Sequence, residues 1–291
     1  MSKNIGIIGA GAIGQALAKA FSKANEINFW DIDKSKCSVE SQQQLVDKSH
    51  IIFLGVPSWA VKEIAESIKT NEPKIVITVA KGVEKGFETM AEVLSKASND
   101  TYTTGVLYGP MLADELSSRK PTSSILATQN EESFNQVQSL ANNNFELIHS
   151  KDMQSVALCG SLKNIYAVAF GLCDGLNLGS NAKGVLATKV IAEMQNVLAK
   201  LNADPNVSLS LAGIGDLLAT GFSELSFNHR TGLSIAKGEK VDKHSSEGVN
   251  ALMEIGSVVD VNEFAILSSL TQIINQKQNA TTFEEIILSQ K

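Results

Sequence analysis

The stretch IGIIGAGAIGQALAKAF, residues 5–21, constrains the fold of this chain more than any other segment. A short aliphatic run ends in Gly9, and Gly11 and Gly14 follow with the spacing G-x-G-x-x-G. Glycine weakens the interior of a regular element, so three of them here indicate a backbone that turns sharply and lies close to another group. The pattern predicts the first strand, loop and helix of a βαβ unit.

Each glycine of this loop has a physical role in such a unit. Gly9 allows the tight turn, Gly11 leaves room for a pyrophosphate against the backbone, and Gly14 lets the helix pack closely on the strand. The free N–H groups at the helix N-terminus favour an anion. We therefore expect the loop to bind a dinucleotide.

An acidic residue follows the loop at the distance that this motif requires. Asp31 ends the second predicted strand, about 20 residues after the loop, where a carboxylate can accept hydrogen bonds from an adenosine ribose. The same carboxylate would repel a 2′-phosphate, so NAD is favoured over NADP, although NADP stays possible. Asp33 is an alternative for this role, because it lies on the same side of an extended chain.

The first half of the chain alternates between short apolar runs and helical patterns, which is typical of a parallel sheet with helices on both faces. The expected strands are continuously apolar, as strands buried on both faces are. They span residues 5–8, 27–30, 51–56, 75–79, 105–108 and 123–127, and the helices between them span 13–22, 60–69 and 88–97.

After about residue 150 the chain shows helical periodicity without a convincing series of strands. The expected helices span residues 156–173, 182–201, 209–219, 229–237, 247–256 and 263–276, with a possible short helix in the tail, 281–291. We predict an α/β protein with a parallel-sheet domain at 1–152 followed by an all-helical domain at 153–291.

Composition excludes several classes of protein. The formal net charge of −6 argues against a general nucleic-acid binder. The N-terminus lacks the pattern of a secretory signal, and no uninterrupted apolar run is long enough to span a bilayer. Three cysteines without a C-x-x-C pair favour reduced, mostly buried thiols and a cytoplasmic protein.

Three polar residues stand out from apolar surroundings. Lys81 follows a predicted buried strand, at the sheet edge where ligands bind in open α/β folds. Lys163 lies within an apolar helix, and Asp216 lies among aliphatic residues. A lysine beside a carboxylate can polarise a carbonyl and transfer a proton to it, but spacing alone leaves open whether Lys163 and Asp216 meet.

Several stretches of the chain resemble the bacterial NAD(P)-dependent glycerol-3-phosphate dehydrogenases. They are GAGAIG at 9–14, VPSWAVKEI at 56–64, AKGVE at 80–84, GPMLADEL at 109–116, the long segment 160–194, LAGIGDLLAT at 211–220, SFNHRTG at 226–232 and SSEGV at 245–249. The resemblance implies a Rossmann-like domain, a helical domain, commonly a homodimer, no metal, and interconversion of glycerol 3-phosphate and dihydroxyacetone phosphate that feeds phospholipid synthesis.

The resemblance also implies roles for residues at matching positions. Lys163 matches the proton-transferring lysine, Lys81 a lysine that touches cofactor and substrate, and Asp216 the acid that orients the substrate side. The remaining matches bind ligands: Ala12, Ile13, Ala113 and Glu247 contact the cofactor, and Gly109, Ser226, Asn228 and Arg230 lie at substrate positions.

Some positions depart from the family pattern. Where the family has the motif S-R-N, this chain has Phe227 in place of the arginine, which in the family contacts phosphate and cofactor. Met111 likewise stands in place of the serine of the family's G-P-S motif. His229 and Arg230 are the nearest basic residues. Loss of a charge-assisted phosphate contact lowers affinity by about 30- to 1,000-fold. We therefore keep two alternatives: a related dehydrogenase for a less charged hydroxy compound, and a dinucleotide-binding protein without turnover.

Overall fold

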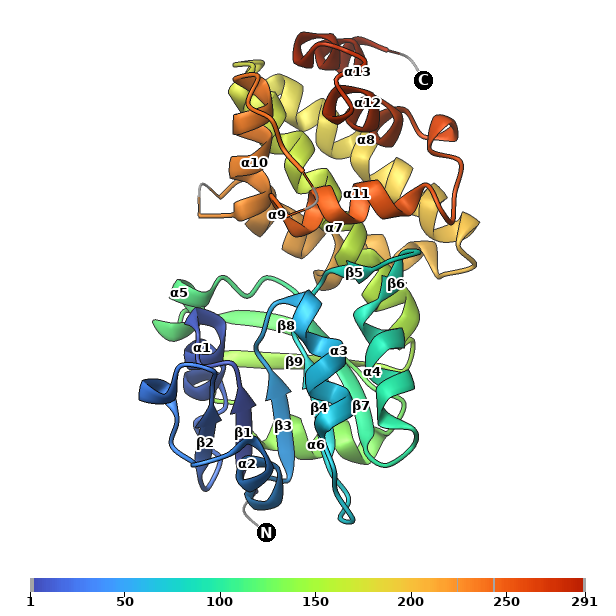
Figure 1. Ribbon diagram of the computed structural model, residues 1–291. Coiled ribbons are helices and arrows are strands. Elements are labelled where there is room, and N and C mark those ends of the chain that lie inside the picture. Colours follow the sequence, from blue (N-terminus) through green and yellow to red (C-terminus); the bar gives the residue numbers. More distant parts are fainter. Residues whose placement is uncertain (1–2, 224, 243, 290–291) are drawn as a thin grey trace. The chain divides into compact units, whose positions relative to one another are not determined.

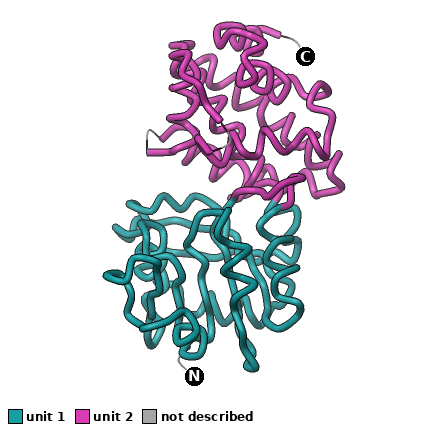
Figure 2. The backbone as a smooth tube through the Cα atoms, viewed as in Figure 1, with its two compact units in different colours: residues 1–81, 89–157 teal, residues 82–88, 158–291 magenta. Residues whose placement is uncertain are grey.

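The computed structural model describes residues 3–223, 225–242 and 244–289. The chain divides into two compact units, residues 1–81 with 89–157 and residues 82–88 with 158–291 (Figure 2). The boundary between residues 157 and 158 falls inside the helix Met153–Gly175. Residues 82–88, although they lie in the first half of the chain, group with the second unit.

The first unit is built around a seven-stranded sheet (Figure 1). Its strand order is β2-β1-β3-β4-β7-β8-β9. In chain order the strands are β1 (Ile5–Ile8), β2 (Ile27–Trp30), β3 (Ile51–Leu54), β4 (Ile75–Thr78), β7 (Thr103–Tyr108), β8 (Thr122–Ala127) and β9 (Phe145–Ser150). The first five are parallel, as the sequence predicts, whereas β8 is antiparallel to β7. β9 was not predicted, because it alternates between buried and exposed residues instead of forming a continuous apolar run.

Helices cover both faces of the sheet and bury separate clusters of side chains. One cluster joins α1 (Ala12–Ala20), α5 (Ala113–Ser117) and α6 (Glu131–Leu140) to the sheet. The other joins α2 (Gln42–Lys48), α3 (Ser58–Ser67) and α4 (Met90–Ser98) to it. A 3₁₀ turn, η1 (Lys34–Lys36), follows β2, and β5 (Val83–Glu84) and β6 (Glu88–Thr89) form a separate two-stranded sheet.

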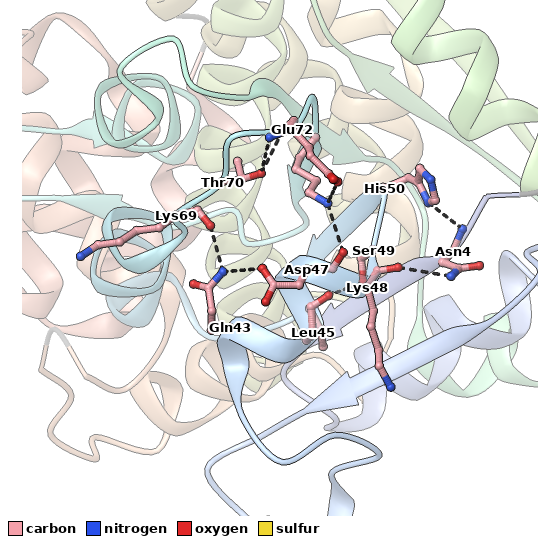
Figure 3. A network of polar contacts seen from close by, with 11 residues as sticks. Asn4, Gln43, Leu45, Asp47, Lys48, Ser49, His50, Lys69, Thr70 and Glu72 are labelled. Carbon is pink, nitrogen blue, oxygen red and sulfur yellow. Dashed lines mark hydrogen bonds and ion pairs between the residues drawn. The ribbon is translucent and has the colours of Figure 1, made fainter.

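The amino ends of β1, β3 and β4 carry a network of polar contacts (Figure 3). The Asn4 amide donates to His50 Nδ1 at 3.2 Å, and Lys74 Nζ lies 3.2 Å from Glu72 Oε2. Burial, together with Lys3 and Lys74, lowers the pKa of His50. These polar groups therefore bind one another at the amino edge of the sheet, whereas Lys81 and Gly109 follow the carboxyl ends of β4 and β7.

The second unit consists mainly of helices around α7 (Met153–Gly175). The other helices are α8 (Gly179–Lys200), α9 (Asp216–Gly221), α10 (Phe227–Ala236), α11 (Glu247–Ile255), α12 (Ala265–Ile274) and α13 (Glu284–Leu288). Short 3₁₀ turns at 205–209, 261–263 and 280–283 and a π-helical turn at 211–215 connect them.

Among the described residues, α7 is long and apolar enough by length and composition to cross a membrane. Lys163 and Asn164 interrupt the apolar sequence of this helix. The apolar window of α7 is entirely buried. It is the central core helix of its unit.

A buried carboxylate joins three helices of this unit. Glu193 on α8 accepts hydrogen bonds from the amides of Ile266 and Leu267 at 2.7 and 3.0 Å, at the start of α12, and from the Tyr166 hydroxyl on α7 at 3.3 Å. Burial raises the pKa of Glu193 although these bonds oppose the change. Free N–H groups at a helix start are thereby satisfied.

Candidate functional site

The glycine loop combines two tightly packed positions with one open position. Gly9 has a φ of +97°, and a Cβ there would lie 2.6 Å from the Gly55 carbonyl oxygen. A Cβ on Gly14 would lie 1.9 Å from the Gly9 carbonyl oxygen, whereas a Cβ on Gly11 would meet nothing within 4 Å. The loop therefore leaves a free space above the start of α1, where a pyrophosphate fits.

The structure distinguishes the two acidic candidates after β2. Asp31 Oδ2 accepts a 2.7 Å hydrogen bond from the Ala10 amide, so this carboxylate lies against the glycine loop. Asp33 instead caps η1 through the Ser35 amide and hydroxyl, at 3.1 and 2.7 Å. These Ser35 bonds, together with Lys36, lower the pKa of Asp33. Of the two carboxylates, Asp31 is therefore the one that contacts the glycine loop.

A second group of expected residues follows the carboxyl ends of β4 and β7. Lys81 is half-buried, and its Nζ donates to the Gly109 carbonyl at 3.1 Å. Gly109 has a φ of +151°, and a Cβ there would lie 2.8 Å from Ser124 Oγ. Ala113 begins α5, which packs against α1. Met111, Ala113 and Ile13 all pack on the core cluster next to α1.

In the second unit, Lys163 and Asp216 meet. Lys163 Nζ on α7 lies 3.2 Å from Asp216 Oδ2 at the start of α9, and both side chains are about 95% buried. The Thr220 hydroxyl accepts from Lys163 Nζ at 2.9 Å and donates to Asp216 Oδ1 at 3.1 Å. A buried ammonium is thus held by a carboxylate and a hydroxyl, an arrangement that suits proton transfer to a carbonyl.

The segment before α9 explains how Asp216 reaches this position. Gly213 interrupts the helical backbone with φ −96° and ψ −106°, inside the π-helical turn. A Cβ there would lie 2.1 Å from the Ser208 carbonyl oxygen, so only glycine fits. The Ser210 hydroxyl caps the turn by accepting from the Ala212 amide at 3.2 Å. Short π-helical turns of this kind are frequent at functional sites.

An amide network lies beside Lys163 in sequence and joins three helices. Asn228 on α10 donates to Asn164 Oδ1 at 3.0 Å and accepts from the Gly248 amide at 2.9 Å. Ser226 caps α10 by accepting from the His229 amide at 3.3 Å. Glu247 begins α11 and is half-buried. The expected substrate residues Ser226 and Asn228 therefore lie in a buried, hydrogen-bonded cluster.

The two basic candidates near Phe227 have different environments. His229 is buried, and its Nε2 lies 2.9 Å from Asp174 Oδ2. Arg230 is exposed, its guanidinium stacks 4.4 Å from the centre of the Phe227 ring, and its Nη1 donates to the Leu225 carbonyl at 2.9 Å. Phe227 itself is 72% exposed. Arg230 is therefore the accessible cation of this pair.

Sequence reasoning missed two residues of this site. Thr220 lies one helical turn after Asp216, so its spacing on α9 could have indicated it. Asn164 directly follows Lys163, but consecutive side chains of a helix point in different directions. Only its hydrogen bond with Asn228 shows that Asn164 belongs to the buried amide network. Within the described ranges, no group of three or more His, Cys, Asp or Glu side chains could hold a metal ion.

Comparison with known proteins places this geometry in a family. Residues 37–134 match the model of the NAD-dependent glycerol-3-phosphate dehydrogenase N-terminus, and residues 152–285 match that of the C-terminus. The chain belongs to the NAD-dependent glycerol-3-phosphate dehydrogenase family. The glycine loop precedes the range matched by the N-terminal model.

Individual relatives of this dehydrogenase family cover most of the chain. A glycerol-3-phosphate dehydrogenase [NAD(P)+] from Thermoanaerobacter sp. (strain X514) is 36% identical, with 92% of this chain and 87% of that protein covered. One from Synechococcus sp. (strain RCC307) is 34% identical, covering 89% and 83%. A solved glycerol-3-phosphate dehydrogenase from Coxiella burnetii has the same fold, with a TM-score of 0.87, 24% identity and 99% of both chains covered.

Proposed function

We propose that this protein interconverts sn-glycerol 3-phosphate and dihydroxyacetone phosphate with a nicotinamide dinucleotide. In the reducing direction, dihydroxyacetone phosphate, NADH and a proton give glycerol 3-phosphate and NAD⁺. The observation that carries this proposal is the buried contact of Lys163 Nζ with Asp216 Oδ2 and Thr220 Oγ1 in a chain of this dehydrogenase family.

The proposed roles follow from the two units taken separately. The nicotinamide supplies the hydride when bound. In the first unit, Gly9, Gly11, Gly14 and Asp31 hold the dinucleotide, while Ala12, Ile13 and Ala113 contact it. Lys81 and Gly109 bind the substrate, and Lys81 also touches the cofactor. The open position at Gly11 and the hydrogen bond from Ala10 to Asp31 support this assignment.

In the second unit, Lys163 donates a proton to the carbonyl oxygen as the alcohol forms, and accepts it in the reverse direction. Asp216 keeps the ammonium in place, and Thr220 fixes it from a second side. Ser226 and Asn228 bind the substrate, with Arg230 as the accessible cation for its phosphate, and Glu247 contacts the cofactor.

NAD is the preferred dinucleotide in this proposal, with NADP as a second possibility. The Asp31 carboxylate beside the loop would repel a 2′-phosphate. Two lysines follow Asp31 in the sequence, and each contacts a neighbouring side chain of the protein. Lys36 Nζ lies 3.4 Å from Asp33, and Lys34 Nζ lies 5.0 Å from the centre of the Trp30 ring.

A second candidate substrate is a less charged hydroxy compound. The exposed ring of Phe227 stands where the glycerol-3-phosphate dehydrogenase family has an arginine. Because an apolar ring cannot pair with a phosphate, this substitution favours weaker phosphate binding. A protein that only binds a dinucleotide is disfavoured, because a buried lysine–carboxylate pair is costly to a fold that does not use it.

The setting of this activity is proposed from the family resemblance. We propose that the protein is a cytoplasmic homodimer whose domains span residues 1–152 and 153–291. We also propose that it supplies glycerol 3-phosphate for phospholipid synthesis. The oligomeric state is measurable by light scattering on the purified protein.

The substrate proposal is tested with purified protein, NADH and either dihydroxyacetone phosphate or unphosphorylated dihydroxyacetone. Oxidation of NADH with the phosphorylated ketone alone supports the proposal. Oxidation with the unphosphorylated ketone alone would favour the second candidate, and Phe227→Arg should then create activity with the phosphorylated one.

A further inference from the structure

The backbone of Ala80, the residue before Lys81, is held through both its amide and its carbonyl group. The Ala80 amide donates to Thr78 Oγ1 at 3.2 Å, and the Ala80 carbonyl accepts a hydrogen bond from the Tyr108 hydroxyl. Thr78 and Tyr108 are both fully buried. The backbone that carries Lys81 is therefore fixed to β4 on one side and to β7 on the other.

The ammonium of Lys81 is held by the same end of β7. Lys81 Nζ lies 5.5 Å from the centre of the Tyr108 ring and donates to the carbonyl of the next residue, Gly109, at 3.1 Å. A cation over an aromatic face is attracted by the ring quadrupole. Tyr108 thus contacts the Ala80 carbonyl through its hydroxyl and the Lys81 ammonium through its ring.

The need for this support follows from the course of the chain. Lys81 is the last residue of its segment in the first unit, and residues 82–88 group with the second unit. The contacts of Ala80 and of the Lys81 ammonium therefore hold Lys81 within the first unit's own fold. A lysine side chain has about 2 kcal/mol of rotamer freedom to lose, so an unsupported ammonium would be poorly oriented.

We propose that Tyr108 is a positioning residue that fixes both the backbone and the ammonium of Lys81 for the substrate and cofactor. This proposal rests on the proposed function, since it takes Lys81 as a ligand-binding residue. The hydroxyl and the ring of Tyr108 make separable contributions, because Tyr108→Phe removes only the first and Tyr108→Leu removes both.

Tyr102 provides a matched control in the same unit. It is a buried tyrosine whose hydroxyl donates to the Ala65 carbonyl at 3.1 Å, as that of Tyr108 does to Ala80, but its partner lies on α3. Loss of either hydroxyl should lower the melting temperature by a similar amount, because each leaves one backbone carbonyl without this donor.

The experiment measures kcat/KM for dihydroxyacetone phosphate in the wild type, Tyr108→Phe, Tyr108→Leu and Tyr102→Phe. We expect losses of about tenfold for Tyr108→Phe and about a hundredfold for Tyr108→Leu, with Tyr102→Phe within about twofold of the wild type. In a Lys81→Ala background, Tyr108→Phe should change kcat/KM by less than about twofold. An equal loss in both backgrounds, or an equal loss from Tyr102→Phe, would overturn the proposal.

A second measurement does not depend on turnover. Reductive methylation with ¹³C-formaldehyde places NMR-visible methyl groups on Lys81 Nζ, whose signal is identified by its loss in Lys81→Arg. The ring face of Tyr108 should shift this signal upfield, and Tyr108→Leu should remove the shift. An unchanged signal in Tyr108→Leu would refute the positioning role, whereas a wild type without dihydroxyacetone phosphate reduction would refute the proposed function alone.

Discussion

Lys163 Nζ lies 3.2 Å from Asp216 Oδ2, and the two buried side chains come from different helices, α7 and α9. Burial also raises the pKa of the neighbouring Cys159 thiol, and the Asp216 carboxylate adds to this effect. Cys159 therefore stays a neutral thiol beside the pair. This lysine–aspartate pair is the group to which we assign proton transfer in the proposed reaction.

Asp31 and Asp33 should respond differently to the same substitution. Asp31→Asn removes the charge beside the glycine loop and should raise the Kd for NADH by about tenfold, because charge-assisted hydrogen bonds are the stronger ones. Asp33→Asn is the control, since the Asp33 carboxylate caps η1 and pairs with Lys36. Fluorescence titration with NADH measures both, and equal Kd changes would contradict the assignment of Asp31.

The glycine loop predicts two opposite outcomes for glycine-to-alanine changes. Gly11→Ala adds a methyl group to open space at φ −72°, so the protein should keep its stability but lose NADH affinity by tenfold or more, about 1.4 kcal/mol. Gly14→Ala should instead lower the free energy of unfolding by about 3 kcal/mol, because the methyl group would collide with the Gly9 carbonyl oxygen. Calorimetry and NADH titration of both variants separate these effects.

The sequence was sufficient for the parts of the fold that depend on continuous apolar runs. It predicted β1 to β4, and it located α7 and α8 to within a few residues. It missed β9 because an edge strand such as Phe145–Ser150 buries only alternate residues. It also missed the reversed direction of β8, because strand direction depends on the connection between strands rather than on their composition.

The candidate site divides in the same way. Spacing identified the glycine loop and favoured Asp31, with Asp33 as an alternative, but only the hydrogen bonds show that Asp31 contacts the loop. The meeting of Lys163 with Asp216 depends on how α7 and α9 pack, and spacing carries no information about that. Thr220 lies one helical turn after Asp216, and this spacing could have indicated their hydrogen bond, but its contact with Lys163 depends on the packing of α7 and α9.

The Asp174 carboxylate should make stability depend on pH. Burial alone would raise the pKa of Asp174, but the hydrogen bonds from Lys183 and His229 lower this pKa by a larger amount. The net pKa therefore lies below the ordinary 3.8. The stabilisation from this group is therefore complete above about pH 4 and is lost as the pH falls through the lowered pKa. The difference in unfolding free energy between wild type and Asp174→Asn should therefore be smaller at pH 3 than at pH 5. A difference that grows on acidification would contradict this account.

The proton-transfer role of Lys163 is the central claim. Lys163→Met removes the proton donor and should lower kcat with dihydroxyacetone phosphate and NADH by about 10²- to 10⁴-fold. Because this change leaves the buried Asp216 carboxylate unpaired, Lys163→Met/Asp216→Asn is prepared beside it to preserve folding. NADH affinity should stay within about threefold of the wild type in the variant that folds.

The most direct measurement is the rate of NADH oxidation by wild type and by the folded Lys163 variant, at saturating dihydroxyacetone phosphate. The account predicts a measurable wild-type rate and at least a hundredfold loss in the variant, with NADH still bound. A variant that oxidises NADH at the wild-type rate would show that Lys163 does not transfer the proton.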